Sequence, residues 1–348
     1  MPAADASPDF APAELERLFA SLGAYGHVLV ALSGGPDSTA LLLLAARWRA
    51  DRGSGPRLSA ATVDHGLRPS ARAEAEAAGA LCAGLGLPHV ILPWTGEKPA
   101  TGLQEAARAA RYDLLLGHAR ETGADALALA HTLDDQAETI LFRLARGSGP
   151  SGLIGMRARS TRAGTDLLRP LLDVPKARLV GHLDGRGVPY ARDPSNLDLR
   201  QARPRLRAVA PVLEAEGLTP ARLARLGLRL ARADAALRVQ AEAAGARCLL
   251  ERSAHRVRLD AARLFVEPEE ISLRILMEAL DAFAGEGEVE LAKAERLHGL
   301  LAEAARAGGR RTGTLAGALA RVESTVLTVT RAPERNKKAA PLAANSTR

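Results

Sequence analysis

Short apolar runs alternate with amphipathic stretches over roughly the first 195 residues of the chain. The apolar runs are continuous, as expected of strands that are buried on both faces of a sheet. Strands are predicted at His27–Leu32, Leu58–Val63, His89–Trp94, Ala126–Ala130 and Leu167–Leu172. Helices are predicted at Ser38–Asp51, Ser70–Leu85, Leu103–Thr122 and Asp134–Arg146. This alternation predicts an α/β fold with a doubly wound parallel sheet.

The pattern changes after a charged, proline-containing stretch at Arg192–Pro211. Beyond it, Leu, Ala and Arg recur at helical spacing, and a Gly/Thr-rich turn then precedes a predicted strand at Arg321–Thr330. We therefore expect a smaller, mostly helical domain with a short C-terminal β element. The expected divisions are a lead-in at 1–26, the α/β domain at 27–210, a helical domain at 211–307, the β element at 308–332 and a disordered tail at 333–348.

The composition of the chain suggests what kind of molecule it binds but does not identify that molecule. Hydrophobic residues make up 47% of the chain, which is enough for a substantial core, and the formal net charge is +7. A basic chain favours a polyanionic partner, although a basic surface that binds nothing in particular explains the charge equally well. Only five of the 47 basic residues are lysines, so arginine supplies nearly all of the positive charge.

Cysteine usage and the absence of membrane signals indicate a cytoplasmic protein with no membrane partner. Cys82 and Cys248 are too far apart for a CxxC pair and too few for a four-thiolate metal site. The first residues lack the basic and apolar regions of a signal peptide. The longest apolar run, Ala40–Ala46, is too short to span a bilayer.

The strongest chemical signal is the segment that follows the first predicted strand and opens a helix. It consists of Ser33, Gly34, Gly35, Pro36, Asp37 and Ser38. Two glycines allow a phosphate to approach the backbone N–H groups, and a helix N-terminus favours an anion. Asp37 would repel phosphate unless a cation lies between them, so Mg²⁺ is expected there. The alternative is an ordinary glycine turn with a helix cap.

Polar residues also follow the second and fourth predicted strands, where a doubly wound sheet places its ligands. Asp64 and His65 end the second strand. After the fourth come His131 and an acidic cluster of Asp134, Asp135 and Glu138, which share a helical face. The cluster could hold Mg²⁺, with Asp134 as a ligand, or a substrate ammonium. Equally, Thr132 and Asp135 fit a capping box, in which case an acid serves only the helix.

Two further patterns are less specific. Arg108 and Arg111 lie one helical turn apart and could bind phosphate, or they could form the solvated side of an amphipathic helix. Residues 147–152 fit GxGxxG but follow a helix and contain Pro150, so they lack the dinucleotide-binding context. A flexible loop facing the substrate is the expected alternative.

The segment SGGPDS resembles the signature of the PP-loop (N-type) ATP pyrophosphatases. Together with DHGLR, QEAARAARY, LAHTLDDQAETILFRLARGSGPSGLIGM and ARDPSNLDLRQARPRLR, it resembles the tRNA(Ile)-lysidine synthase family in order and spacing. The resemblance covers about residues 28–210 strongly. Thr132 stands where many members have a second histidine, and Pro204 where many have asparagine.

The resemblance implies an ATP-dependent ligase that uses Mg²⁺ and L-lysine. It would adenylate the wobble cytidine of tRNA(Ile) bearing a CAU anticodon and then replace AMP with lysine. It implies catalytic roles for Asp37, His131, Asp135 and Glu138, an ATP site at 33–38 with Asp64 and His65, and phosphate contacts for Arg108 and Arg111. RNA contacts are implied for Asn196, Arg203, Arg205 and Arg207.

Two alternatives stay open at this point. One is a tRNA thiolase of the same superfamily, although such enzymes usually need paired cysteines or an iron–sulfur cluster. The other is a basic RNA-binding protein without catalysis. The sequence leaves the oligomeric state open, with a homodimer among the alternatives.

Overall fold

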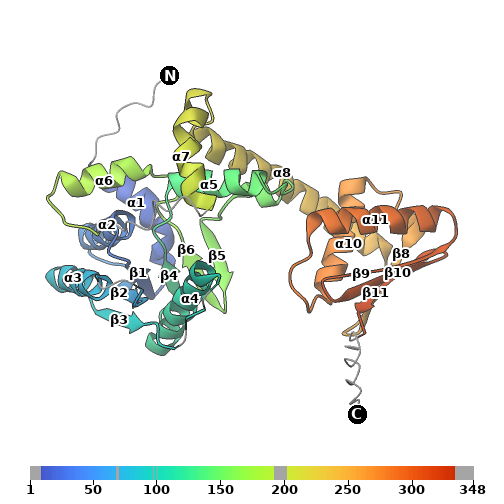
Figure 1. The fold of residues 1–348 in the computed structure, drawn as a ribbon, viewed down its shortest axis with the longest axis horizontal. Coiled ribbons are helices and arrows are strands. Elements are labelled where there is room, and N and C mark those ends of the chain that lie inside the picture. Colours follow the sequence, from blue (N-terminus) through green and yellow to red (C-terminus); the bar gives the residue numbers. More distant parts are fainter. Residues whose placement is uncertain (1–8, 68–69, 97, 100, 192–201, 334–348) are drawn as a thin grey trace, which may run out of the picture. The chain divides into compact units, whose positions relative to one another are not determined.

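The computed structural model describes residues 9–67, 70–96, 98–99, 101–191 and 202–333 (Figure 1). Grouped by their contacts, the residues form two compact units, Met1–Leu230 and Ala231–Arg348. Residues 211–230, which the sequence pattern assigns to the helical domain, group with the first unit. No helix within the described ranges is both long enough and apolar enough to cross a bilayer.

A six-stranded sheet of order β3-β2-β1-β4-β6-β5 forms the centre of the first unit (Figure 1). Neighbouring strands run parallel except β5, which pairs antiparallel with β6. This sheet confirms the predicted fold class. Its strands are β1 (His27–Ala31), β2 (Arg57–Asp64), β3 (His89–Pro93), β4 (Ala126–Ala128), β5 (Arg159–Arg162) and β6 (Thr165–Leu168).

Helices cover both faces of this sheet. On β1, Val28 and Val30 belong to the core cluster that includes Trp48 of α2, whereas Leu29 belongs to the one that includes Leu115 of α4. Alternate residues of one strand thus enter two cores, which explains why the strand is apolar throughout. The helical elements of this unit are α1 (Pro12–Phe19), η1 (Ala20–Ala24), α2 (Pro36–Arg52), α3 (Ala71–Gly84), α4 (Leu103–Thr122), α5 (Leu133–Leu144), η2 (Gly152–Ile154), α6 (Lys176–Asp184) and α7 (Ala202–Ala215), and α8 (Pro220–Cys248) starts in it.

The strand order reverses between β1 and β4, which lie side by side at the centre of the sheet. A doubly wound sheet opens a crevice at this point, outside the carboxyl ends of the two strands. The segment 33–38 follows β1, and His131 follows β4. The topology therefore brings together two segments that are nearly 100 residues apart in sequence.

The second unit contains a five-stranded antiparallel sheet of order β7-β8-β11-β10-β9 (Figure 1). Apolar residues on one face of the sheet, such as Val322 and Leu327, share a core with Leu276 of α10 and Leu301 of α11. The elements are β7 (Leu249–Arg252), β8 (Arg256–Asp260), α9 (Ala261–Leu264), α10 (Glu269–Asp281), α11 (Leu291–Arg306), β9 (Arg310–Leu315), β10 (Ala318–Glu323) and β11 (Val326–Arg331).

Several local predictions were wrong. β7 and β8 lie within 211–307, where the spacing indicated only helices. The single strand predicted at Arg321–Thr330 is the end of β10 and most of β11, because Ser324 (φ 53°) makes a turn between them. The strand predicted at Leu167–Leu172 ends at Leu168. The predicted disordered tail lies, apart from residue 333, outside the described residues.

Candidate active site

The segment after β1 forms a tight loop that passes directly into α2. Gly34 adopts φ 77°, a left-handed conformation that glycine accepts without strain. The Ser38 hydroxyl accepts the N–H of Ser33, at 3.1 Å, and lies 3.0 Å from the Ser33 hydroxyl. Pro36 occupies the first turn of α2, where it removes no helical hydrogen bond. The result is a rigid turn whose backbone and hydroxyls can hold a phosphate.

Asp37 pairs with a lysine that is remote in sequence. The Lys176 ammonium donates to Asp37 Oδ2 at 2.7 Å, from the first residue of α6. Asp37 Oδ1 is buried and has no hydrogen-bond partner among the described residues. Burial raises the pKa of the Asp37 carboxyl, the Lys176 hydrogen bond and charge oppose that rise, and Asp135 and Asp134 add to it. A carboxylate oxygen with no partner in a phosphate loop suits a hard cation.

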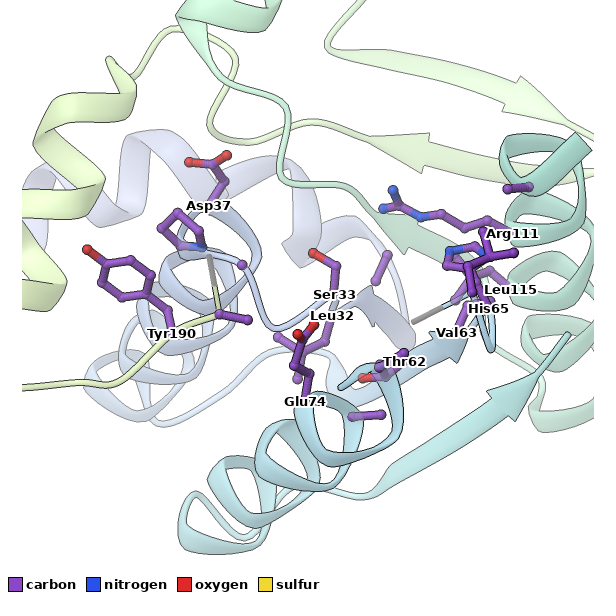
Figure 2. A pocket seen from close by; sticks show the side chains of 18 of the residues that line it. Leu32, Ser33, Asp37, Thr62, Val63, His65, Glu74, Arg111, Leu115 and Tyr190 are labelled. Carbon is purple, nitrogen blue, oxygen red and sulfur yellow. The ribbon is translucent and has the colours of Figure 1, made fainter. Parts of the chain in front are cut away.

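The loop lines a cavity of about 960 Å³ at the carboxyl edge of the sheet. Figure 2 shows Asp37 and Tyr190 toward one side of this cavity, Arg111 and His65 toward the other, and Ser33 and Glu74 between them. The cavity is large enough for a nucleotide, since small-molecule sites in proteins are typically about 300–1,000 Å³. Of the predicted site residues, it is lined by Ser33, Gly35, Pro36, Asp37, His65, Arg111, Asp135 and Arg207.

The two residues that end β2 have different surroundings. His65 lines the cavity and packs edge-on against Trp94, with ring centroids 6.1 Å apart. Asp64 does not line it, and its carboxylate accepts the N–H of Gly66 at 2.9 Å. Asp64 therefore shapes the turn that presents His65.

Arginines gather around Tyr112 of α4, and none of them pairs with a carboxylate of the described residues. The Arg108 guanidinium lies 5.4 Å and that of Arg162 4.5 Å from the Tyr112 ring centroid. Arg169 donates to Ser160 and to the Arg157 carbonyl, and its buried Nε has no partner within the described ranges. Burial lowers the pKa of both Arg111 and Arg169. Partly buried like charges without acids favour an anionic ligand.

His131 lies within reach of the charges of this arginine cluster, lines neither of the two cavities described here, and is uncharged near neutral pH. Burial lowers its pKa to about 4, and the charges of Arg169, Arg111 and Arg108 also act in that direction, against Asp135. Its Nδ1 is buried and has no hydrogen-bond partner in the described part of the chain. A neutral imidazole with an open ring nitrogen can hydrogen-bond a base or an adenylate.

Two of the three acids on α5 are engaged as helix caps. Asp135 completes a capping box: it accepts the N–H of Thr132 at 2.9 Å, and the Thr132 hydroxyl accepts the N–H of Asp135. Asp134 accepts the backbone N–H of Lys176 at 2.7 Å, which fixes the start of α6. The capping alternative therefore applies to Asp135, although this residue also lines the large cavity.

Glu138 instead forms an ion pair with Arg207 of α7, which donates to both of its carboxylate oxygens. Together they border a second cavity of about 180 Å³. Its walls are mostly aliphatic and come from α5, α7 and the start of α8, with the acids Asp134, Glu138 and Glu214 among them. An aliphatic slot with carboxylates suits a side chain that is apolar along its length and cationic at its end.

The remaining predicted residues contribute less. Arg205 is exposed on α7. Asn196 and the side chain of Arg203 lie outside what the structure describes. Residues 147–152 line neither cavity, and the Arg143 side chain donates to the carbonyls of Gly152 and Gly155.

Sequence reasoning missed Lys176 and Arg169. Lys176 is the first residue of α6 and Arg169 directly follows β6, and no pattern around either residue indicates chemistry. The scarcity of lysine was a usable signal for Lys176, because only five of the 47 basic residues are lysines.

Comparisons with known proteins agree with this geometry. The PP-loop domain family matches residues 11–213. A tRNA(Ile)-lysidine synthase of a Bradyrhizobium species is 47% identical over 342 residues, which cover 94% of this chain and 96% of the relative. The chain belongs to the tRNA(Ile)-lysidine synthase family. A second member, from Methylobacterium nodulans, is 53% identical over 90% of this chain and 92% of its own.

A solved structure shares the fold at much lower identity. The U34-tRNA thiolase NcsA of Methanococcus maripaludis superposes with a TM-score of 0.54 at 19% identity, over 62% of this chain and 77% of its own. This likeness concerns the fold alone. Cys82 and Cys248 are both buried, lie in different units, and burial raises the pKa of Cys82 to about 11. Neither thiol is suited to carry sulfur.

Proposed function

We propose that the chain ligates lysine to C2 of the wobble cytidine of tRNA(Ile) with a CAU anticodon. In the first step, cytidine O2 attacks the α-phosphorus of ATP, the bond to the β-phosphate breaks and pyrophosphate leaves. In the second, the lysine ε-amine attacks C2 and AMP leaves with the oxygen. The observation that carries the proposal is the phosphate loop, which opens into one cavity with Arg111 and His65 at the strand-order reversal.

For adenylation, residues 33–38 hold the ATP phosphates, and His65 lies in the same cavity. Asp37 is the residue that would hold Mg²⁺, through the carboxylate oxygen that has no partner among the described residues. Mg²⁺ typically takes one or two carboxylates and completes its shell with phosphates and water, so one acid suffices. Bound there, it would offset charge on the phosphates.

The arginine cluster stabilises negative charge on the opposite side of the cavity. Arg111 lines the cavity, and Arg108 and Arg169 add positive charge behind it. We assign these residues to phosphate oxygens of the adenylate or of the RNA. His131, neutral at pH 7, contributes a hydrogen bond to the cytidine or the adenylate.

The second cavity is the proposed lysine site. Its aliphatic walls suit the four methylenes of lysine, and Glu138 is the acid that would bind the amine and accept its proton before attack. Asp135 is the other candidate, since it lines the adjoining cavity. Asp134 is the less suitable metal ligand, because its carboxylate already holds the start of α6.

RNA binding is assigned to Asn196 and to three basic residues of α7: Arg203, Arg205 and Arg207. To reach the cavity, the wobble base must leave its stack, as is usual when proteins read single-stranded RNA. We further propose that the protein acts in the cytoplasm, where its tRNA substrate is found. A homodimer is the oligomeric state to test, by sedimentation.

The proposal can be tested by measuring the incorporation of labelled lysine into tRNA. The protein is incubated with ATP, Mg²⁺, labelled lysine and tRNA(Ile) bearing CAU, beside the same tRNA with uridine in place of the wobble cytidine. Label should enter only the cytidine-bearing tRNA, and mass analysis should identify lysidine as the product. Adenylation without lysine incorporation, combined with sulfur transfer from a donor, would overturn the proposal and favour a thiolase.

A further inference from the structure

Lys176 occupies an unusual position for a residue outside the phosphate loop. Its ammonium lies 2.7 Å from Asp37 Oδ2, and its side chain lines both cavities. Its backbone is fixed, because its N–H donates to Asp134 and it is the first residue of α6. The side chain keeps 45% of its surface exposed, so the ammonium has room to turn while the backbone stays in place.

A stabilising ion pair with Asp37 is not a sufficient reason for a lysine at position 176. The lysine of this pair keeps 45% of its side-chain surface exposed, and an ion pair that solvent reaches adds little to stability. The partner is also the acid proposed to hold Mg²⁺. With Mg²⁺ on Oδ1 and the ammonium on Oδ2, two cations would share one carboxylate, and their repulsion favours a move of the ammonium toward the phosphates. The segment 33–38, moreover, contains no basic residue, whereas other phosphate loops place a lysine on the terminal phosphates.

We propose that Lys176 binds the pyrophosphate end of ATP: its ammonium neutralises Asp37 in the absence of nucleotide and turns to the β- and γ-phosphates when ATP binds with Mg²⁺. The inference rests on the proposed function, because it assumes cleavage between the α- and β-phosphates. When that bond breaks, its electron pair passes to the pyrophosphate oxygen. Lys176 stays protonated and offsets the charge that develops there.

The test compares ligands that differ only in the phosphates that Lys176 would touch. Binding of ATP, AMP and inorganic pyrophosphate, each with Mg²⁺, is measured by calorimetry for the full-length protein and for Lys176→Gln. A hydrogen bond between charged groups corresponds to roughly 10- to 100-fold in affinity. We therefore expect Lys176→Gln to lose about 10-fold or more for ATP and pyrophosphate, with AMP unchanged.

Two variants act as controls. Lys176→Arg keeps the charge and should keep most of the pyrophosphate affinity, which separates charge from packing. Lys293→Gln removes an exposed lysine of the second unit, which pairs with Glu290 three residues away, and should change none of the affinities.

An equal loss for AMP and pyrophosphate, or no loss for either, would overturn the proposal. The first result would mean that Lys176 acts only by keeping Asp37 in place. Because these measurements use neither tRNA nor lysine, they are separate from the test of the proposed function. Lysine incorporation by the wild-type protein would stand even if Lys176 proved not to touch pyrophosphate.

Discussion

The guanidinium of Arg207 on α7 binds both carboxylate oxygens of Glu138 on α5, across 69 residues of sequence. The side chain of Glu138 is 13% exposed and that of Arg207 is 39% exposed. Residues that we assign to two substrates, lysine and RNA, therefore neutralise each other when neither is bound. The Glu138 hydrogen bond and charge raise the pKa of Arg207, with Asp135 and Asp37 adding to the effect.

Glu138→Ala should impair lysine use far more than adenylation. Losing a charged partner for the amine corresponds to roughly 10-fold or more in the KM for lysine. ATP–pyrophosphate exchange in the presence of tRNA should change much less. Glu121→Ala, which removes an acid that is 79% exposed on α4, is the matched control. Equal losses in exchange and lysine incorporation would remove Glu138 from the lysine site.

Asp37→Asn should nearly abolish nucleotide chemistry while stabilising the fold. Loss of an electrostatic partner of the transition state costs about 10²–10³ in rate. Burial raises the pKa of the Asp37 carboxyl, so the folded protein disfavours the charged form and loses stability as the pH rises through that pKa. The variant should therefore melt at a higher temperature at pH 7, and the difference should shrink as the pH falls. Normal turnover by the folded variant would contradict the Mg²⁺ assignment.

His131 should make the fold acid-sensitive. Its pKa in the folded protein is about 4, below the ordinary value of 6.5, so the unfolded chain binds the proton more readily. The stability contributed by the neutral ring is present above pH 6.5 and is lost as the pH falls through 4, with a limit of roughly 3 kcal/mol.

Denaturant unfolding of His131→Gln should consequently change less between pH 7 and pH 4 than that of the wild type. The control is His255→Gln, which removes an exposed histidine from the second unit. If NMR titration of His131 gave a midpoint near 6.5, the buried, neutral imidazole would be ruled out.

Replacing both cysteines should leave lysine incorporation intact. Cys82 and Cys248 are buried, and burial raises the pKa of each thiol, so neither is poised to form a thiolate. The double variant Cys82→Ala/Cys248→Ala should lose stability, because each change removes a buried sulfur, and should retain product formation in the mass assay. Loss of activity in a folded double variant would reopen the thiolase alternative.

The parallel sheet could be predicted from sequence because its central strands, β1 and β4, are short, mainly apolar runs that alternate with amphipathic helices. β5 could not, because its residues, Arg159–Arg162, are all polar and lie at the sheet edge. β7 was missed because it follows α8 without a break. β8 was missed because it is short, alternates Arg with apolar residues, and lies in a region where apolar residues recur mostly at helical spacing.

The candidate site was predictable where residues follow a strand end. The loop at 33–38 and His65, which follow β1 and β2, meet in one cavity, as the strand order requires. The sequence could not predict which of the three acids on α5 serve as helix caps. Asp134, Asp135 and Glu138 look alike in sequence and differ only in the partners that they contact. Nor could sequence predict that Lys176 reaches Asp37, since that contact depends on how α6 packs against α2.

The turn of α5 from Asp134 to Glu138 has residues on both cavities: Asp135 lines the larger one, and Asp134 and Glu138 line the smaller. Lys176 and Arg207 line both cavities, so the two cavities lie next to each other and share part of their walls. One turn of helix rises only about 5.4 Å. If the cytidine binds in the larger cavity as proposed, the adenylated base would not have to move between the two half-reactions. Under the proposed assignment, it would stay where it was adenylated, and the lysine amine would reach it across about one turn of α5.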